Sequence, residues 1–307
     1  MTQLARAARR FLPISPAAAG AFIFCCTIER IERYRGRGMK LVTSKDCQLR
    51  VEHTPRPGAP ALLLLNPLGV SLDIWDEQLA ALSERYELIR FDARGHGKST
   101  IGEHREATIE LLANDALAVL EACGVARAHL CGVSLGGMIA MHIAAHAPDC
   151  VLKVVLSNTT PYMPPRENWE QRIQTVRAQG VEPLIEGTLG RWFTPEFHQA
   201  HPEKVAKVGA LLRETSPEGY AACCAAIRDM DQRESIRNIT SKTLVIGGTK
   251  DAGTTPAMAQ LIASSVPEAK LVMLEAAHLT NIERTEDFNA ALIEFLEGEL
   301  APQPEIA

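Results

Sequence analysis

Short apolar runs alternate with amphipathic segments along most of the chain, and this rhythm restricts the fold more than any other feature. The run at 61–65 (ALLLL) lies between Pro60 and Pro67, which is typical of a strand buried on both faces. The segment at 109–123 places Leu112, Ala116, Val119 and Leu120 on one face, as an amphipathic helix does. Strands that alternate with helices predict a parallel sheet covered by helices on both faces.

The pattern predicts an α/β fold with a mostly parallel, eight-stranded sheet. The first two strands, at 39–43 and 49–53, alternate apolar and polar residues, so we expect them to be antiparallel edge strands. The other six are expected at 61–65, 87–91, 128–133, 151–157, 243–247 and 270–274.

The rhythm stops after the sixth strand and resumes near residue 239. Three prolines open the intervening region, and several helical segments follow without strands between them. An insertion at this point would form a lid over the carboxyl ends of the strands, where open α/β sheets bind their ligands. We therefore predict a core of residues 39–157 and 239–300, a helical lid at 158–238 and a C-terminal tail at 301–307.

Residues 1–38 differ from the rest of the chain in charge. They hold seven Arg and two Glu, a formal charge of +5, whereas the whole chain carries −5 and residues 39–307 therefore carry −10. A basic start and a short apolar stretch give the outline of a signal peptide, but two prolines interrupt it and Cys25-Cys26-Thr27 is a poor cleavage site. We predict that this N-terminal extension is disordered or not translated, with Met39 as the functional start.

The composition excludes several classes of protein. Of the 307 residues, 46% are hydrophobic and 22% are charged, which is too apolar for a disordered chain. The net charge of −5 disfavours a nucleic-acid partner, and no apolar run reaches the roughly 18–20 residues of a membrane span. The eight Cys show no C-x-x-C spacing, so we expect reduced thiols in a cytoplasmic protein.

The segment Gly132-Val133-Ser134-Leu135-Gly136 matches the motif G-x-S-x-G. It lies between an apolar strand and a segment with helical spacing, which is the context that a nucleophile elbow requires. A serine at such a strained turn is exposed to substrate, and the backbone N–H of Leu135 at the helix start can face a developing oxyanion. We therefore predict Ser134 as the catalytic nucleophile.

A serine nucleophile needs a histidine base, and the base needs a carboxylate that orients it. Asp251 follows the predicted strand at 243–247, and His278 follows the strand at 270–274. Taken singly, these residues would be a turn aspartate and a surface histidine. Because they follow Ser134 in the chain order serine, acid, histidine, we predict that the three form a catalytic triad.

The loop after the third strand, Asn66-Pro67-Leu68-Gly69, should supply a second oxyanion donor. We predict the N–H of Leu68, because proline has none. The turn Asp92-Ala93-Arg94-Gly95-His96 also contains an acid and a histidine, but His96 precedes the elbow and breaks the chain order. We therefore expect this turn to be structural, with Asp92 and Arg94 bracing it.

No metal or organic cofactor is expected. His142 and His146 are four residues apart in a helical segment, but the glutamate of the H-E-x-x-H motif is missing, and no phosphate-binding glycine loop is present.

Several segments together resemble the 3-oxoadipate enol-lactonases, which are α/β-hydrolases of aromatic-compound degradation (the β-ketoadipate pathway). They are NPLGVSLDIWDEQLAAL, FDARGHGKS, GVSLGGMIAMHIAAHAP, RWFTPEF, EGYAACCAAIRDMD and AAHLTNIE. The resemblance extends from about residue 40 to 296. It implies the α/β-hydrolase fold, the triad Ser134, Asp251 and His278, and hydrolysis of a small anionic lactone without a cofactor.

The resemblance also implies a carboxylate on the substrate, which needs a cationic or N–H-rich partner in the lid. Arg191, Trp192 and Arg228 are candidates because they lie in the lid segments that are specific to this group of hydrolases. The alternative for each arginine is a surface charge that solvent or an acidic side chain compensates.

Two other interpretations of the same residues are open. The chain could be a general carboxylesterase or a cofactor-free haloperoxidase (perhydrolase) on the same fold, which a panel of simple esters tested beside the enol-lactone would reveal. It could also be a non-catalytic receptor that only binds a ligand, which turnover would exclude.

Overall fold

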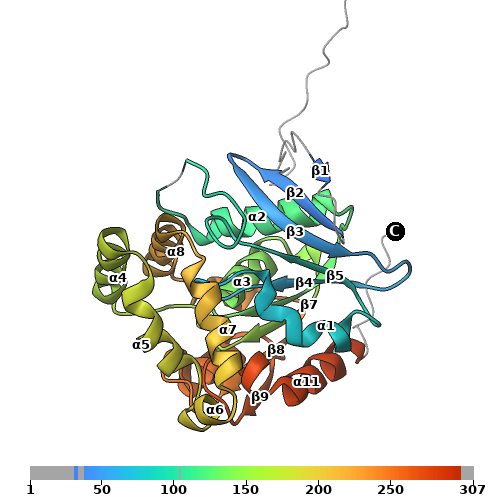
Figure 1. Ribbon diagram of the computed structural model, residues 1–307. Coiled ribbons are helices and arrows are strands. Elements are labelled where there is room, and N and C mark those ends of the chain that lie inside the picture. The colour runs from blue at the N-terminus through green and yellow to red at the C-terminus, as the bar shows by residue number, and fades with distance from the viewer. Residues whose placement is uncertain (1–30, 34–37, 104, 299–307) are drawn as a thin grey trace, which may run out of the picture.

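The computed structural model describes residues 31–33, 38–103 and 105–298. Within them, nine strands form one sheet in the order β1-β2-β3-β5-β4-β6-β7-β8-β9 (Figure 1). The strands are β1 (Ile31–Arg33), β2 (Met39–Ser44), β3 (Cys47–Thr54), β4 (Ala61–Leu65), β5 (Glu87–Phe91), β6 (Ala128–Val133), β7 (Val151–Ser157), β8 (Lys242–Gly248) and β9 (Lys270–Leu274).

The sheet has an antiparallel edge and a parallel centre. β1, β2, β3 and β5 pair antiparallel in succession, whereas β5, β4, β6, β7, β8 and β9 are parallel. The central strands β4 and β6 are buried along their whole length, because helices cover both of their faces. The eight strands expected from the sequence are β2–β9, so the predicted fold class is confirmed.

The strand β1 was not expected. The sequence assigns residues 1–38 to an extension outside the fold, but Ile31–Arg33 pair with Lys40–Val42 of β2. A backbone ladder depends little on side-chain pattern at an edge, so these three residues carry no apolar signal that would have indicated a strand. The rest of the predicted extension, residues 1–30 and 34–37, and the predicted tail at 301–307 lie outside the described residues.

Two layers of helices enclose the sheet. On one side α2 (Ile109–Ala122), α3 (Leu135–His146) and α9 (Pro256–Ser265) pack on the strands, and on the other side lie α1 (Asp76–Leu82) and α11 (Thr285–Glu297). Four short helical segments complete the core: η1 (Leu72–Trp75), η2 (Pro148–Cys150), η3 (Ser235–Asn238) and α10 (Thr280–Glu283).

Five helices lie between β7 and β8, in the segment that the sequence predicts as a lid. They are α4 (Arg166–Gln179), α5 (Glu182–Trp192), α6 (Pro195–Ala200), α7 (Pro202–Arg213) and α8 (Pro217–Asp229). In Figure 1, α4, α5 and α8 lie at the left, where α4 packs on α8, while α6 lies at the bottom and α7 near the middle of the view. The two ends of the segment meet, because Tyr162 and Asp231 form an antiparallel bridge and the Gln232 N–H donates to the Pro161 carbonyl at 2.8 Å.

The turn after β5 is braced by buried charges. Arg94 Nε and Nη2 donate to the two carboxylate oxygens of Asp115 in α2 at 2.7 and 2.8 Å, and both side chains are inaccessible to solvent. Asp92 accepts hydrogen bonds from the Leu72 and Lys98 N–H groups. Burial lowers the pKa of His96 in the same turn to about 4, so its imidazole is neutral at pH 7. Together these contacts give the turn a structural role.

None of the helices in the described segments is long and apolar enough to cross a membrane.

Replacing Arg94 with leucine should destabilise the fold strongly. The substitution leaves the buried Asp115 carboxylate without its bidentate partner, which costs about 3–5 kcal/mol of unfolding free energy. Arg213→Leu breaks an ion pair of similar geometry with Glu182 on the surface, and its cost should be about 1 kcal/mol or less. Chemical denaturation of both variants measures the difference, and equal losses would contradict a bracing role for Arg94.

Candidate active site

Ser134 lies at a sharp turn between β6 and α3. Its backbone has φ 55° and ψ −116°, a region that non-glycine residues rarely adopt and that costs on the order of 1–3 kcal/mol. The neighbouring strand holds the turn in place, because the Ser134 N–H donates to the Ser157 carbonyl at 2.9 Å and Thr159 Oγ1 donates to the Ser134 carbonyl at 2.7 Å. This is the strand–turn–helix arrangement that the sequence motif predicts.

The two glycines of the motif are required by close backbone approach. A Cβ atom at Gly136 would lie 2.0 Å from the carbonyl oxygen of Leu65, at the end of β4, and one at Gly132 would lie 2.2 Å from the carbonyl oxygen of Gly136. Neither contact involves a flexible side chain that could move away. Only glycine therefore allows α3 to begin this close to the sheet.

His278 and Asp251 form a direct pair. His278 Nδ1 lies 2.8 Å from Asp251 Oδ2, and both side chains are nearly inaccessible to solvent. Asp251 follows β8 and His278 follows β9, so the two loops meet because these parallel strands are neighbours. With Nδ1 donating its proton to the carboxylate, the other ring nitrogen, Nε2, is left as a proton acceptor.

Asp251 is held as a carboxylate by five donors. Its Oδ2 accepts from His278, from Thr254 Oγ1 at 2.6 Å and from Asn158 Nδ2 at 3.0 Å. Its Oδ1 accepts from the backbone N–H groups of Gly253 and Thr254 in the same loop. Burial alone would raise the pKa of Asp251, but the charge of His278 and these hydrogen bonds outweigh burial and hold the pKa well below its usual range. The carboxylate is therefore charged at any pH near neutrality.

The loop predicted to supply an oxyanion donor is fixed by Asn66. Asn66 Nδ2 donates to the Phe91 carbonyl at 2.8 Å, and Asn66 Oδ1 accepts from Trp75 Nε1 at 2.9 Å. Leu68 in this loop and Leu135 at the first position of α3 are both buried, at the ends of the adjacent parallel strands β4 and β6. The N–H of Leu135 belongs to the first turn of a helix, where N–H groups have no partner within the helix.

The lid reaches the histidine through Trp192. The indole stacks on the imidazole of His278, with ring centroids 5.9 Å apart and an angle of 28° between the planes, and the Leu279 N–H donates to the Trp192 carbonyl at 3.1 Å. A second link runs through Glu283, which accepts from the N–H and hydroxyl of Thr194 and from the Ala277 N–H. These contacts fix the end of α5 against the loop that carries His278.

Arg228 does not fit the role that the sequence analysis gave it. Its guanidinium bonds to three carboxylates, those of Glu106, Glu170 and Asp229, at 3.2, 2.6 and 2.7 Å. These bonds, the one to Asp229 first, raise the pKa of Arg228. A guanidinium that already holds three carboxylates has little capacity for another, so Arg228 is an ion-pair centre that joins α8 to α4 and no longer a candidate substrate contact.

Arg191 lines a cleft of ≈ 510 Å³ between the lid and the core. Arg172 of α4, Gly253 and Met258 also line this cleft. The N–H of Gly253 donates to Asp251, so the cleft borders the loop of the acid. Burial lowers the pKa of Arg191, and the nearby positive charge of Arg172 lowers it further.

The guanidinium groups of Arg172 and Arg191 contact uncharged partners. Arg172 Nη1 donates to the hydroxyl of Tyr220 at 3.0 Å and the guanidinium lies over the ring of Trp169, while Arg191 Nη2 lies 3.4 Å from Thr188 Oγ1. Two adjacent positive charges bound to neutral groups attract an anion to this cleft.

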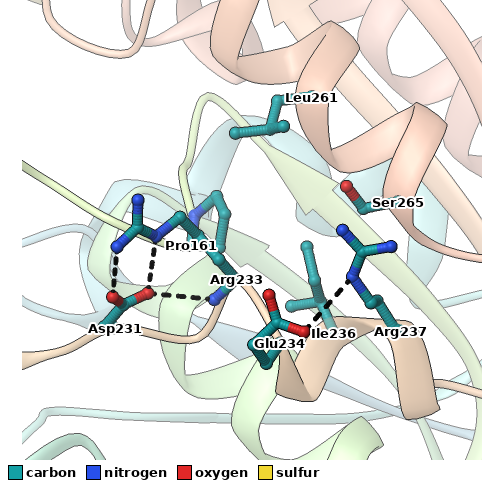
Figure 2. A pocket seen from close by; sticks show the side chains of 8 residues that line it. All are labelled: Pro161, Asp231, Arg233, Glu234, Ile236, Arg237, Leu261 and Ser265. Carbon is teal, nitrogen blue, oxygen red and sulfur yellow. Dashed lines mark hydrogen bonds and ion pairs between the residues drawn. The ribbon is translucent and has the colours of Figure 1, made fainter.

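A second surface cavity, of ≈ 390 Å³, lies between the end of the lid and α9. Figure 2 shows that its charged side chains pair with one another, Arg233 with Asp231 and Arg237 with Glu234. Its charges are therefore compensated internally, and the cleft beside Arg172 and Arg191 offers the better anion site.

Across residues 31–33, 38–103 and 105–298, no group of three His, Cys, Asp or Glu side chains is arranged to hold a metal ion. A cofactor-free reaction stays a prediction.

Sequence reasoning missed four residues of the site: Asn158, Arg172, Thr254 and Glu283. Asn158 is the first residue after β7, and a polar residue at the carboxyl end of a buried parallel strand is a signal that could have indicated it. Thr254 lies three residues after Asp251. Arg172 approaches the site only through tertiary packing, which no local pattern encodes. Glu283 is close to His278 in the chain, but its bond to Thr194 spans 89 residues and has no local signal.

Gly136→Ala should impair catalysis at the elbow. The added methyl group would meet the Leu65 carbonyl, so α3 must move and displace Ser134, and a displacement of about 1 Å costs on the order of 100-fold in rate. Gly190→Ala is the matched control, because a Cβ atom there meets nothing within 4 Å and should stabilise α5 by about 1 kcal/mol. Hydrolysis of a chromogenic ester, measured beside the melting temperature, tests this, and full activity of Gly136→Ala would contradict it.

Comparisons with known proteins show the family to which this fold belongs. Residues 60–285 match the α/β hydrolase fold family. The chain is 35% identical over 253 residues to 3-oxoadipate enol-lactonase 2 of Acinetobacter baylyi, covering 82% of this chain and 94% of the relative. It is 31% identical to 3-oxoadipate enol-lactonase 1 of the same organism, covering 78% and 90%.

Among solved structures, the crystal structure of the enol-lactonase from Burkholderia xenovorans LB400 is similar. It superposes with a TM-score of 0.80 at 35% identity, covering 82% of this chain and 97% of that one. The chain therefore belongs to the α/β hydrolase family, in the group that contains the 3-oxoadipate enol-lactonases.

Proposed function

We propose that the protein hydrolyses 3-oxoadipate enol-lactone to 3-oxoadipate, in the degradation of aromatic compounds, with Ser134, His278 and Asp251 as its catalytic triad. The observation that carries the proposal is the buried His278–Asp251 pair at 2.8 Å, at the same edge of the parallel sheet as a serine in a strained strand–helix turn. The enol-lactonases at 31% and 35% identity support the choice of substrate.

The first half of the reaction transfers the acyl group to the serine. Ser134 Oγ attacks the lactone carbonyl carbon while His278 Nε2 takes the hydroxyl proton. Asp251, which holds Nδ1, stabilises the imidazolium that forms. The negative charge that develops on the carbonyl oxygen is stabilised by the N–H groups of Leu68 and Leu135.

Collapse of the tetrahedral intermediate then breaks the ring carbon–oxygen bond. The leaving oxygen departs as an enolate, a better leaving group than an alkoxide, and it takes the proton from His278 and tautomerises to the ketone. In the second half, water loses a proton to His278 and attacks the acyl-enzyme ester. The proton returns to Ser134 Oγ, and the new carboxyl group of the product loses its remaining proton to solvent, which gives the 3-oxoadipate dianion.

The substrate is an anion, and the cleft beside Asp251 supports binding of its carboxylate. Arg191 and Arg172 bring two guanidinium groups to this cleft, and Trp192 packs on His278 where it can contact a small bound ring. A carboxylate held here would pair with two guanidinium groups that donate hydrogen bonds to neutral groups within the protein. We place the reaction in the cytoplasm, because the six cysteines of the described segments are free thiols, the state that a reducing compartment maintains.

Ser134→Ala should abolish hydrolysis of the enol-lactone without unfolding the protein. The substitution removes one oxygen at the elbow, and loss of a triad serine lowers kcat by several orders of magnitude. Incubating purified enzyme with the lactone and quantifying 3-oxoadipate measures this. Near-normal turnover by a folded variant would exclude Ser134 as the nucleophile, and rapid hydrolysis of simple esters with none of the lactone would favour a general carboxylesterase.

Arg172→Gln and Arg191→Gln should weaken selection for the acidic substrate. A charge-assisted hydrogen bond contributes about 1.5–3 kcal/mol, which is on the order of 10- to 150-fold in kcat/KM. We expect the wild-type enzyme to hydrolyse the free acid lactone with a higher kcat/KM than its methyl ester. In each variant this acid-to-ester ratio should fall by that factor. Arg228→Gln is the control: its guanidinium is engaged by three carboxylates, so the acid-to-ester ratio should stay unchanged. A ratio near one in the wild type would contradict a carboxylate site in the cleft.

A further inference from the structure

Asn158 lies at the centre of the site, although neither motif nor chain order indicates it. It is the first residue after β7, between the elbow that follows β6 and the acid loop that follows β8. Its side chain is 2% exposed. A buried amide must find hydrogen-bond partners within the protein, because each unpaired polar group there costs about 1–3 kcal/mol.

All four hydrogen-bonding positions of this amide are used. Nδ2 donates to Asp251 Oδ2 at 3.0 Å and to the Ala277 carbonyl at 3.1 Å. Oδ1 accepts from Ser157 Oγ at 2.8 Å and from Thr280 Oγ1 at 2.7 Å. An amide has two donors and two strong acceptor positions, so its orientation is fixed by its surroundings.

These partners belong to the two loops that carry the acid and the base. Asp251 is the acid itself, while Ala277 and Thr280 flank His278 on either side. One side chain therefore bonds to the carboxylate and to the backbone and side chain that determine where the imidazole lies. Ser157, at the end of β7, anchors the amide to the sheet.

The backbone of Asn158 is also unusual. Its φ is 45°, in the left-handed region that asparagine tolerates better than other residues with a side chain. The Asn158 N–H donates to the Ile246 carbonyl of β8 at 2.9 Å, which holds this conformation. The left-handed conformation turns the chain out of β7 and places the amide between the two loops.

We infer that Asn158 is a positioning residue that holds Asp251 and His278 in register for proton transfer. This inference rests on the proposed triad. An amide is required rather than a carboxylate, because a second acid beside Asp251 would replace a donor with a like charge. An apolar side chain would remove one of the five donors to the carboxylate, the donor to the Ala277 carbonyl and the acceptor of two hydroxyl groups.

Two substitutions distinguish the effect of the side-chain amide from the effect of the backbone conformation. Asn158→Gly removes the amide and keeps the left-handed conformation available, and Asn158→Asp keeps the shape and exchanges donors for acceptors. Each should lower kcat by on the order of 10- to 100-fold, with KM changed less than about threefold, because neither touches the substrate. Thr280→Val, which removes one donor to the amide, should give a smaller loss in the same direction.

The second measurement is independent of activity. The proton between His278 Nδ1 and Asp251 should give a downfield proton resonance in the wild-type enzyme, and this resonance should broaden or disappear in both Asn158 variants. Asn289→Asp is the matched control, because Asn289 is a buried asparagine of α11. It should change neither kcat nor the resonance.

Unchanged kcat and an unchanged resonance in folded Asn158 variants would overturn the inference. So would losses that the Asn289→Asp control reproduces, since these would reflect general destabilisation. If either Asn158 variant fails to fold, the kcat and the downfield resonance of Thr280→Val test the inference instead. An unchanged kcat and resonance in that variant would overturn it. Ser134→Ala, assayed in parallel, tests the proposed function separately: activity in that variant would refute the nucleophile, while the resonance would still decide the role of Asn158.

Discussion

The approach of α3 to the end of β4 is the constraint on which the active site depends. The first turn of this helix lies so close to the Leu65 carbonyl that no side chain fits at Gly136, and the chain must reverse at Ser134 with a positive φ. The flanking strand β7 supplies the hydrogen bonds that offset this strain. As a result, the serine and the N–H groups at the start of the helix lie at the carboxyl edge of the sheet. The loops after β8 and β9 begin at the same edge.

Specific side-chain contacts join the lid to the core. Trp192 at the end of α5 stacks on His278, and Glu283 joins Thr194, the N-cap of α6, to the histidine loop. A movement of α5 would therefore displace the imidazole. By contrast, the ion pairs of Arg228 bind α8 to α4 within the lid. The lid is thus braced internally by these ion pairs and joined to His278 at one end.

The sequence predicted what depends on local pattern. The apolar run of β4 between two prolines, the glycines around Ser134, and the polar residues that follow β8 and β9 are each visible within a few positions. What it missed depends on packing between distant segments. Arg228 was a candidate substrate contact because its partners Glu106 and Glu170, 122 and 58 residues away, cannot be recognised as neighbours without the fold. Arg172 was missed for the same reason, whereas Asn158 directly follows β7 and its place at the end of a buried strand was a local signal.

The bridge between Tyr162 and Asp231 closes the lid segment on itself. The chain leaves the sheet and returns to it at nearly one point, so the length and content of the excursion do not affect the spacing of β7 and β8. The entropy of closing such a loop grows only slowly with its length. An exchange of this segment between related hydrolases that keeps the contacts of Trp192 and Thr194 with the core would therefore alter which molecules are accepted while His278 stays in place, and divergence of substrate range can proceed without reinvention of the chemistry.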